Sequence, residues 1–527
     1  MRLGAFLMTL LLMTGTVSAG NIEDTGDILV SGSIGEPSTL IPILAADTAS
    51  GGICGLIFNG LVKYDKDLNL VGSLAERWEI LDAGLTIVFH LRQDVRWHDG
   101  HPFTAEDVEF TYQSLIDPNV RTPYAEDFLR VQTFKILDPH TLRITYKEPF
   151  APAIPSWGMS IMPKHLLAGQ DLQTTPFRRN PVGTGPYRFK RWVTADRVEL
   201  EANPDYFEGP PQIRGWIERI IPDQGTLFLE LQAEGIDLTD LTPLQYKRQT
   251  GTDFFEKHYQ KFRYPSSGYT YLGYNLTLPM FSDLRVREAL NYAIDKEELV
   301  RGVLLGLGVA STGPFPPESW AYNPDVHAVS CDPQKAKALL AEAGWKDTDR
   351  DGWLDKNSRR FEFTILTNKN LSRELSAQII QRRLKEIGVL VNIRVLEWSS
   401  FLNNFIYPRQ FEAVLLGWSL GQDPDLYDLW HSSKTKPGEF NFVGYKNAEV
   451  DKLLEAGRRT FDQAERARIY YEVHRILYDE QPYCFLYVPD ALPIVHARIK
   501  GIKPAPAGIS YNLINWYVPK HQHKYED

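Results

Sequence analysis

The 527-residue sequence contains little cysteine and, beyond its first twenty residues, no long apolar run. Its three cysteines, Cys54, Cys331 and Cys484, lie far apart, which excludes a CxxC motif and a disulfide-dense scaffold. We interpret them as buried small apolar side chains, because a core of this size does not depend on disulfides. No later segment has 18 uninterrupted apolar residues, so the sequence predicts a soluble mature protein.

Basic residues are also scarce relative to acidic ones. The chain has 57 Lys and Arg against 67 Asp and Glu, a net charge of −10 that is spread along the sequence. Nucleic-acid binding needs a concentrated basic face, so no nucleic-acid partner is predicted. GxSxG and HExxH motifs are absent as well, and we expect neither catalysis nor a cofactor. A secreted hydrolase stays an alternative, since carboxylates paired in space are invisible in a sequence.

The first nineteen residues have the features of an export signal. Arg2 supplies positive charge, residues 5–13 are apolar, and Val17-Ser18-Ala19 offers the small side chains that signal peptidase accepts. We expect cleavage before Gly20 and a periplasmic or secreted protein without a lipid anchor, because position 20 is not Cys. The alternative is a buried N-terminal helix. An intact mass that still includes residues 1–19 in exported protein would exclude cleavage.

The pattern of elements changes along the chain. Short strand-like runs at 28–30, 86–91, 141–146 and 198–201 dominate the first half. Helical spacing follows at 283–301, ending at Gly302, and at 333–343 after Asp332. Further helices are predicted at 448–457 and 462–479, before a strand at 483–488. The order indicates a β-rich lobe, an α/β lobe and a return to the first lobe.

A βαβ unit is predicted within the α/β lobe. Residues 361–365 alternate as a strand, Ser372 is the expected cap of a helix that Gly388 closes, and residues 389–395 alternate again. Such a unit implies two parallel strands joined by a right-handed crossover. Another apolar run, 414–416, ends in Gly417-Trp418. Ligands of open α/β sheets gather at the carboxyl ends of strands, which is where Trp418 is expected to lie.

Several blocks resemble one family closely. They are SLAERW (73–78), FHLRQDVRWHDG (89–100), PFTAEDV (102–108), PVGTGPY (181–187), VREALNYAID (286–295), LLAEAGW (339–345), GW (417–418) with DPD (423–425), residues 441–451, and PY (482–483). In this order they resemble the family 5 extracellular solute-binding proteins of ATP-driven importers, which include dipeptide-, oligopeptide- and nickel-binding proteins. The resemblance covers essentially the whole mature chain.

The resemblance implies a two-lobed periplasmic-binding-protein fold, type II and cluster C-like. Lobe I would comprise 26–272 and 484–527, with an inserted subdomain at about 60–180, and lobe II would span 273–483. Crossings near 271–275 and 485–487 would form the hinge. The implied function is capture of a peptide or peptide-like solute by a monomer, for delivery to ABC transporter permease subunits. Nickel–chelator, opine or sugar ligands and a chemosensory role stay open.

The resemblance also implies where a ligand binds. The expected ligand-binding residues are Glu36, Pro37, Ser38, Tyr271, Asn275, Trp418, Ser419, Leu420 and Asp423. An extended ligand between the 36–38 and 417–420 segments would bind as an added strand. Peptide-binding relatives place an Asp just after the Gly-Trp pair to bind the ligand's ammonium, whereas this chain has Gly421-Gln422. We therefore expect only a weak preference for a free N-terminus, since Glu36 or Asp423 would have to replace that Asp.

Other polar motifs have structural interpretations. Thr104 and Asp107 predict a capping box, which accounts for part of the histidine- and acid-rich 90–107 block. Asp347, Asp349 and Asp351 match the opening of a calcium loop, but Ser358 stands at its twelfth position, where a bidentate Glu is usual. No metal site is predicted, and calcium is kept as an alternative.

Overall fold

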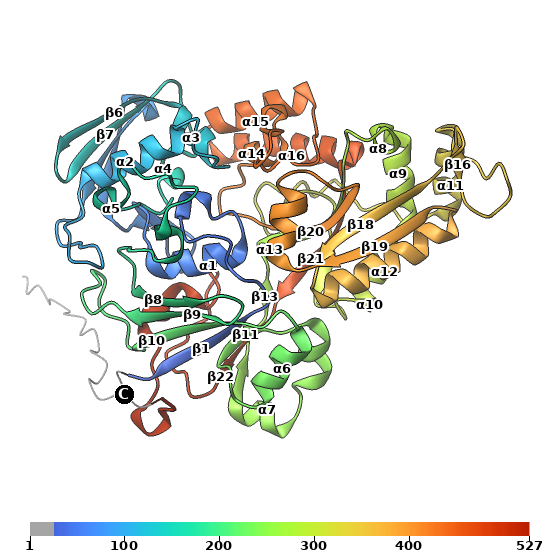
Figure 1. Cartoon of the computed structure of the whole chain (residues 1–527). Helices are drawn as coiled ribbons and strands as arrows, with labels where there is room; N and C mark the ends of the chain where they lie inside the picture. Colours follow the sequence, from blue (N-terminus) through green and yellow to red (C-terminus); the bar gives the residue numbers. More distant parts are fainter. Residues whose placement is uncertain (1–25, 526–527) are drawn as a thin grey trace, which may run out of the picture.

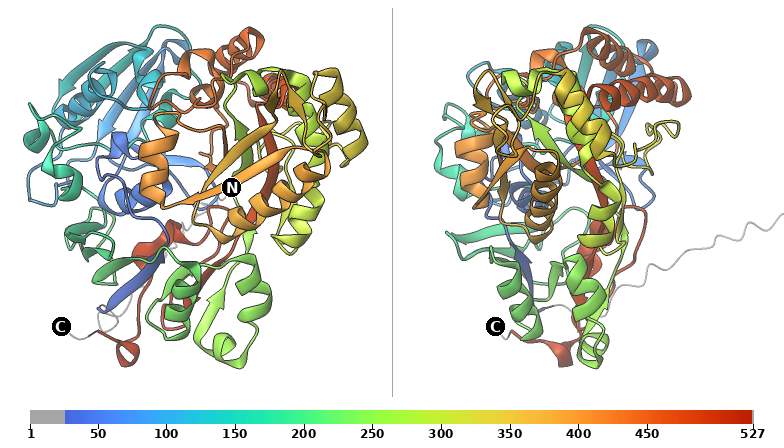
Figure 2. Two further views of the ribbon diagram at one scale, coloured as in Figure 1. Left: turned by 45° about the vertical axis from the view of Figure 1, so that its right-hand side comes forward. Right: turned by 90° about the vertical axis from the view of Figure 1, so that its right-hand side faces the viewer.

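The computed structural model describes residues 26–525 as two lobes that lie side by side (Figures 1 and 2). The predicted signal peptide and the mature N-terminus at Gly20 lie outside these residues. Within them, no helix has the length and apolar character needed to cross a membrane. Cys54 and Cys484 are buried and Cys331 is half-buried, all as free thiols, in line with their interpretation as small core side chains.

Lobe I is built on a seven-stranded sheet of order β12-β22-β11-β1-β10-β9-β8. β1 pairs in parallel with β10 and β11, and the other pairs are antiparallel. One apolar cluster joins this sheet to α1 and the inserted segment, and another joins it to α6 and α7. The elements are β1 (Ile28–Ser33), α1 (Thr48–Ile57), β8 (Tyr187–Val193), β9 (Arg197–Ala202), β10 (Gly215–Ile220), α6 (Gln224–Gln232), β11 (Leu238–Asp240), α7 (Asp253–His258), β12 (Tyr259–Lys261) and β22 (Pro493–His496).

A separate four-stranded antiparallel sheet of order β4-β5-β7-β6 is inserted into lobe I. Its elements are β4 (Ala75–Leu81), β5 (Thr86–Leu91), α2 (Ala105–Ile116), α3 (Ala125–Leu129), β6 (Val131–Asp138), β7 (Thr141–Tyr146), α4 (Ala153–Ser156) and α5 (Lys164–Leu167), preceded by a hairpin of β2 (Val62–Tyr64) and β3 (Leu70–Gly72). The predicted capping box is confirmed, because Thr104 and Asp107 bond reciprocally at the start of α2.

Lobe II is built on a second seven-stranded sheet, ordered β13-β21-β14-β20-β18-β19, with β15 paired to β21. Helices α9–α12 and α14–α16 pack around it (Figure 1). The elements are β13 (Tyr264–Pro265), β14 (Gly268–Tyr274), α8 (Pro279–Ser282), α9 (Leu284–Ala293), α10 (Lys296–Gly302), β15 (Gly308–Ala310), α11 (Pro333–Glu342), β16 (Asp355–Lys356), β17 (Arg359–Arg360), β18 (Glu362–Asn368), α12 (Leu371–Glu386), β19 (Leu390–Leu396), α13 (Trp398–Phe401), β20 (Ala413–Ser419), α14 (Tyr427–Trp430), α15 (Ala448–Arg459), α16 (Gln463–Glu480) and β21 (Tyr483–Ala491).

The predicted βαβ unit is confirmed, since β18 and β19 pair in parallel and α12 connects them in the chain. Its cap is Asn370 rather than Ser372, because the Asn370 side chain accepts the Arg373 N–H and starts the helix earlier. The helix expected over 283–301 is two helices, α9 and α10. The chain becomes extended at Ile294, and Asp295 caps the second helix.

Within residues 26–525, the chain passes twice between the two seven-stranded sheets. β12 and β22 belong to the lobe I sheet, whereas β13 and β21 belong to the lobe II sheet, so the changes fall between Lys261 and Tyr264 and between Ala491 and Pro493. The strand that contains Tyr271, which we expected at the first crossing, lies wholly in lobe II, where it pairs with β20 and β21. The second crossing likewise falls after residues 485–487.

A buried ion cluster joins the first strand of lobe I to the end of the chain. Arg498 is paired with Asp27 and, through Nε at 2.7 Å, with Asp237. Their side chains are 3%, 0% and 2% exposed. Asp27 also accepts the backbone N–H groups of Lys524 and Tyr525 at 3.0 Å. The cluster therefore holds β1, β11, β22 and the C-terminal segment together.

Candidate functional site

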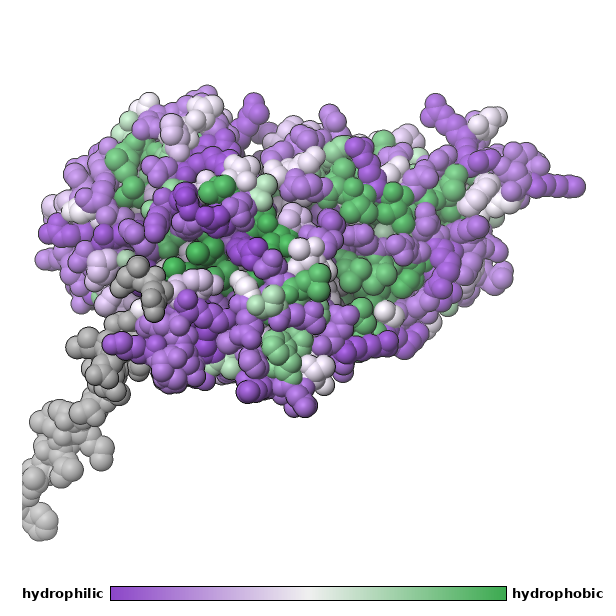
Figure 3. All heavy atoms as spheres, turned by 60° about the horizontal axis from the view of Figure 1, so that its bottom comes forward, coloured by the Kyte–Doolittle hydropathy of each residue, from purple (hydrophilic) through white to green (hydrophobic). Residues whose placement is uncertain are grey.

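The two lobes contact each other at several points, and the predicted site residues come from both lobes. In the middle, Trp398 Nε1 of lobe II donates to Asp47 Oδ1 of lobe I at 3.4 Å. Beside α6, Leu371 N donates to Gln224 Oε1 at 2.7 Å, and Lys369 pairs with Asp223 at 3.1 Å. When the bottom of the molecule in Figure 1 is turned toward the viewer, its surface is largely hydrophilic, with apolar patches among the hydrophilic residues (Figure 3).

The lobe I side consists of the segment that follows β1. The Glu36 carboxylate accepts from Trp192 Nε1 at 2.8 Å and from Ala195 N. Ser38 Oγ donates to Asp47 Oδ2 at 2.7 Å, and Pro37 is buried. The polar side chains of Glu36 and Ser38 are thus engaged within lobe I, which anchors this segment to the rest of that lobe.

The lobe II side is the carboxyl end of β20. Trp418 is half-buried among Tyr271, Phe440 and Phe442, at ring-centroid distances of 6.4, 5.3 and 5.6 Å. Its indole N–H points to Tyr483 Oη at 3.4 Å. Ser419 is exposed and Leu420 half-buried. Trp418 therefore forms one edge of an aromatic wall at the end of the strand.

One edge of β20 lacks a strand partner near Trp418. β14 pairs with β20 along its whole length, from Ala413 to Ser419. β18 pairs only with Ala413 and Val414, and a Thr367 hydroxyl contacts Leu415 O. Within residues 26–525, the β18-facing edge of β20 therefore has no strand beside it from Leu416 onward. An unpaired edge of this kind can accept an extended chain.

Arg373 lies next to that edge and was not among the predicted site residues. It sits in the first turn of α12, and its Nη1 donates to Asn368 Oδ1 at 2.6 Å. A Cβ at Gly417 would lie 3.1 Å from Nη2, so the guanidinium rests against the β20 backbone. Among the described residues no carboxylate pairs with Arg373, and desolvation by the surrounding protein lowers its pKa. A desolvated guanidinium with free donors is suited to an anionic ligand group.

A sequence signal for Arg373 does exist. A positive charge in the first turn of a helix opposes the helix dipole, which favours acidic residues there. Here that unfavourable placement coincides with the end of a parallel strand, where ligands of α/β sheets bind.

The other predicted residues are engaged in contacts of their own. Asp423 is held by both terminal nitrogens of Arg466 at 2.7 Å. Tyr271 is fully buried and stacks on Tyr483 at 3.9 Å, close to Trp418. Asn275 follows the far end of β14, where its amide donates to Phe411 O and its oxygen accepts from Thr277. The structure thus brings Tyr271 and Trp418 together and places Asn275 away from them.

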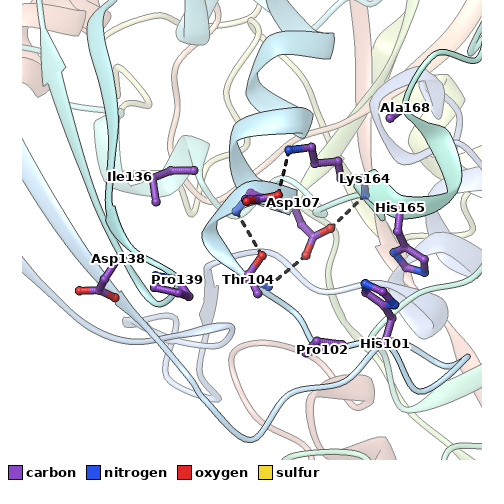
Figure 4. A pocket seen from close by; sticks show the side chains of 11 residues that line it. His101, Pro102, Thr104, Asp107, Ile136, Asp138, Pro139, Lys164, His165 and Ala168 are labelled. Carbon is purple, nitrogen blue, oxygen red and sulfur yellow. Dashed lines mark hydrogen bonds and ion pairs between the residues drawn. The ribbon is translucent and has the colours of Figure 1, made fainter.

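A hollow of about 670 Å³ lies elsewhere, in the inserted subdomain (Figure 4). His101 and His165 stack there at 4.1 Å, and Lys164 pairs with Glu106 at 2.9 Å. The buried Asp107 carboxylate accepts from Trp97 Nε1, Thr104 N and Lys164 N. These bonds fix the loop and helix of the 90–107 block, in agreement with its structural interpretation.

Among residues 26–525, two groups of side chains have metal-ligand composition. Asp347, Asp349 and Asp351 are exposed, and Asp351 is paired with Arg360. Glu234, His258 and His496 form the second group. His496 Nδ1 accepts the Arg498 N–H at 3.1 Å, so its proton lies on Nε2 and points to Glu234. That nitrogen has no lone pair for a metal, so this group is a hydrogen-bonded cluster.

Comparisons with known proteins agree with this architecture. Residues 69–440 match the model of the family described as bacterial extracellular solute-binding proteins, family 5. The oligopeptide-binding protein AppA of Bacillus subtilis is 36% identical over 95% of this chain and 93% of its own length. Its structure with a nonapeptide superposes with a TM-score of 0.90, at 34% identity, covering 94% of this chain and 99% of that one.

Two further solved structures extend the range of ligands among similar proteins. NikZ of Campylobacter jejuni, in complex with Ni(L-His), has a TM-score of 0.84 at 29% identity, covering 93% of this chain and 99% of that one. DppA of Helicobacter pylori, in complex with the peptide STSA, has a TM-score of 0.85 at 27% identity, with coverage of 94% and 99%. With its two lobes, its ordered sequence blocks and these matches, the chain belongs to the family 5 bacterial extracellular solute-binding proteins.

Proposed function

We propose that this protein captures a peptide between its lobes and delivers it to the permease subunits of an ATP-driven importer. The observation that carries the proposal is the Arg373 guanidinium, which no carboxylate of residues 26–525 pairs with, beside the free edge of β20. The edge offers main-chain groups to an extended backbone, Arg373 offers a partner for a carboxylate, and Trp418 offers an apolar face. Similar proteins with bound peptides, such as AppA and DppA, support this ligand class.

A compact carboxylate ligand is the second candidate, because NikZ binds Ni(L-His) and another similar protein, AgaA, binds agropinic acid. Such ligands would also suit Arg373. They lack the repeating amide groups that an unpaired strand edge satisfies, so the edge favours a peptide. The chemosensory and hydrolase alternatives would use the same boundary between the lobes.

Incubation of the protein with a mixture of two- to ten-residue peptides is expected to enrich a subset and return it intact. A peptide that binds only the folded protein stabilises it by RT ln(1 + [L]/Kd), about 2.7 kcal/mol at 100 times Kd, so the melting temperature should rise. Native mass spectrometry and a thermal scan measure the two effects. Cleaved peptides would favour the hydrolase, and enrichment of non-peptide carboxylates alone would favour the second candidate.

A further inference from the structure

The lobes also meet where α3 of lobe I contacts α15 of lobe II, in the upper part of Figure 1. The Arg458 side chain at this contact is 1% exposed. Its Nη2 donates to Asp127 Oδ1 of lobe I at 2.8 Å, and its Nε donates to Asp425 Oδ2 of lobe II at 2.7 Å. The guanidinium also stacks over the Tyr427 ring at 4.0 Å. One buried cation therefore joins carboxylates of both lobes.

A second cation and a main-chain bond complete the contact. Lys434 of lobe II, 8% exposed, lies 3.0 Å from Glu126 of lobe I and 3.5 Å from Asp428. The Ala151 N–H of lobe I donates to Arg458 O at 2.7 Å. These bonds reach across the boundary, so the whole set forms only when the lobes are together. We call Arg458, Lys434 and their carboxylates, Glu126, Asp127, Asp425 and Asp428, the latch.

The latch holds more negative than positive groups. Its four carboxylates face two cations. The nearby Arg130 is directed mainly to Glu148 at 2.9 Å, and lies 3.8 Å from Glu126. On the outer side, His431 is turned toward Asp451 and Glu455. Within residues 26–525, neither Asp428 Oδ1 nor Arg458 Nη1 has a hydrogen-bond partner. Carboxylates crowded together with only 10–22% of each side chain exposed resist full ionisation, so the latch is suited to hold a proton.

We propose that the latch is proton-linked: closing the lobes takes up a proton in the carboxyl groups around Arg458, so acidification favours the closed form. The latch lies well away from the changes of sheet at β13 and β21 (Figure 1), so hinge opening would separate its two halves. Proton linkage of this kind changes the open–closed equilibrium of the protein by itself, without a captured ligand.

The direction follows from the environment of Asp428 and Asp127. Burial, opposed in part by Arg458, raises the pKa of Asp127, and burial raises the pKa of Asp428 to about 7. Opening separates Asp127 and Glu126 from the lobe II carboxylates and admits water. The pKa values of Asp127 and Asp428 then return toward ordinary values near 4. At pH values between the open-form pKa near 4 and the closed-form pKa of about 7, the closed form binds more protons than the open form. Closure is therefore favoured as pH falls, and the effect ends above about pH 8.

Single-molecule energy transfer on the ligand-free full chain tests the proposal. Dyes would be attached at exposed Gln132 of lobe I and Glu449 of lobe II, each changed to Cys, with Cys331 replaced by Ser. The closure equilibrium constant is expected to rise about tenfold from pH 8 to pH 6, as one group with a pKa near 7 requires. In Asp428→Asn the constant should be nearly independent of pH.

Asp127→Asn should also reduce the pH dependence, because it fixes one of the two carboxyls of raised pKa in a neutral form. Asp479→Asn, which changes an exposed carboxylate of α16 paired with Arg475, is the matched control and should retain the wild-type profile. A flat wild-type profile, an unchanged slope in Asp428→Asn, or no closed population at either pH would overturn the proposal. None of these readouts involves a ligand, so they do not depend on the proposed function.

Discussion

We expect the substitution Arg373→Gln to weaken the binding of a peptide with a free carboxylate about 100-fold. Removing one member of a desolvated charge pair costs about 2–5 kcal/mol, and about 2.7 kcal/mol corresponds to 100-fold in Kd. The glutamine keeps a donor and much of the side-chain length, so the loss reports on charge. Isothermal titration with a peptide that the wild type binds measures it. Arg382→Gln, an exposed arginine of the same helix paired with Glu298, should leave Kd unchanged.

The chemical origin of this loss can be isolated by changing the ligand. Amidation of the peptide's C-terminus should weaken binding to the wild type strongly and to Arg373→Gln only slightly, because the two changes remove the same interaction. Acetylation of the N-terminus should have a small effect, since Glu36 and Asp423 are engaged in other bonds. Equal losses on amidation in both proteins would contradict the role of Arg373. A tens-fold loss on acetylation would reveal an amine site elsewhere.

Arg498→Met is expected to lower the free energy of unfolding of lobe I by about 3–5 kcal/mol. It would leave Asp27 and Asp237 buried without their counter-charge, and breaking a buried ion pair in this way is strongly destabilising. Urea unfolding followed by tryptophan fluorescence measures the change. The effect should be larger than that of any single exposed pair.

The matched control is Arg475→Met, because Arg475 pairs with Glu472 and Asp479 on the exposed face of α16. A surface pair of this kind contributes about 0–1 kcal/mol. Similar small losses in the two variants would show that the aspartates find water or other partners when Arg498 is absent. The buried cluster would then not be a main support of lobe I.

Local signals in the sequence predicted much of the fold. The βαβ unit of lobe II followed from period-two runs on either side of a helical run, and the capping box followed from Thr104 and Asp107. Errors were also local. Asn370 is as good a cap as Ser372, and a helical spacing that continues through Ile294 does not reveal that Asp295 starts a new helix.

Features that depend on contacts between residues far apart in the sequence were harder to predict. Tyr271 was expected at a crossing, but its strand is held in lobe II by partners in β20 and β21, more than 140 positions later in the chain. Trp418 was expected at the end of its strand because that position follows from an apolar run. Arg373 was missed, because its significance lies in the lack of a carboxylate partner among the described residues, which depends on every neighbour in space.

The position of β22 has a consequence for how the molecule is made. β22 lies between β12 and β11, inside the lobe I sheet, yet it follows the whole of lobe II in the chain. Until residues 493–498 have emerged from the ribosome, β11 and β12 have an open gap between them, and Asp237 has no Arg498. Lobe II can complete its own sheet sooner, once β21 is present. The lobe I sheet therefore waits for β22 although its other strands are synthesised first, and a nascent chain stays unfinished through nearly all of its synthesis.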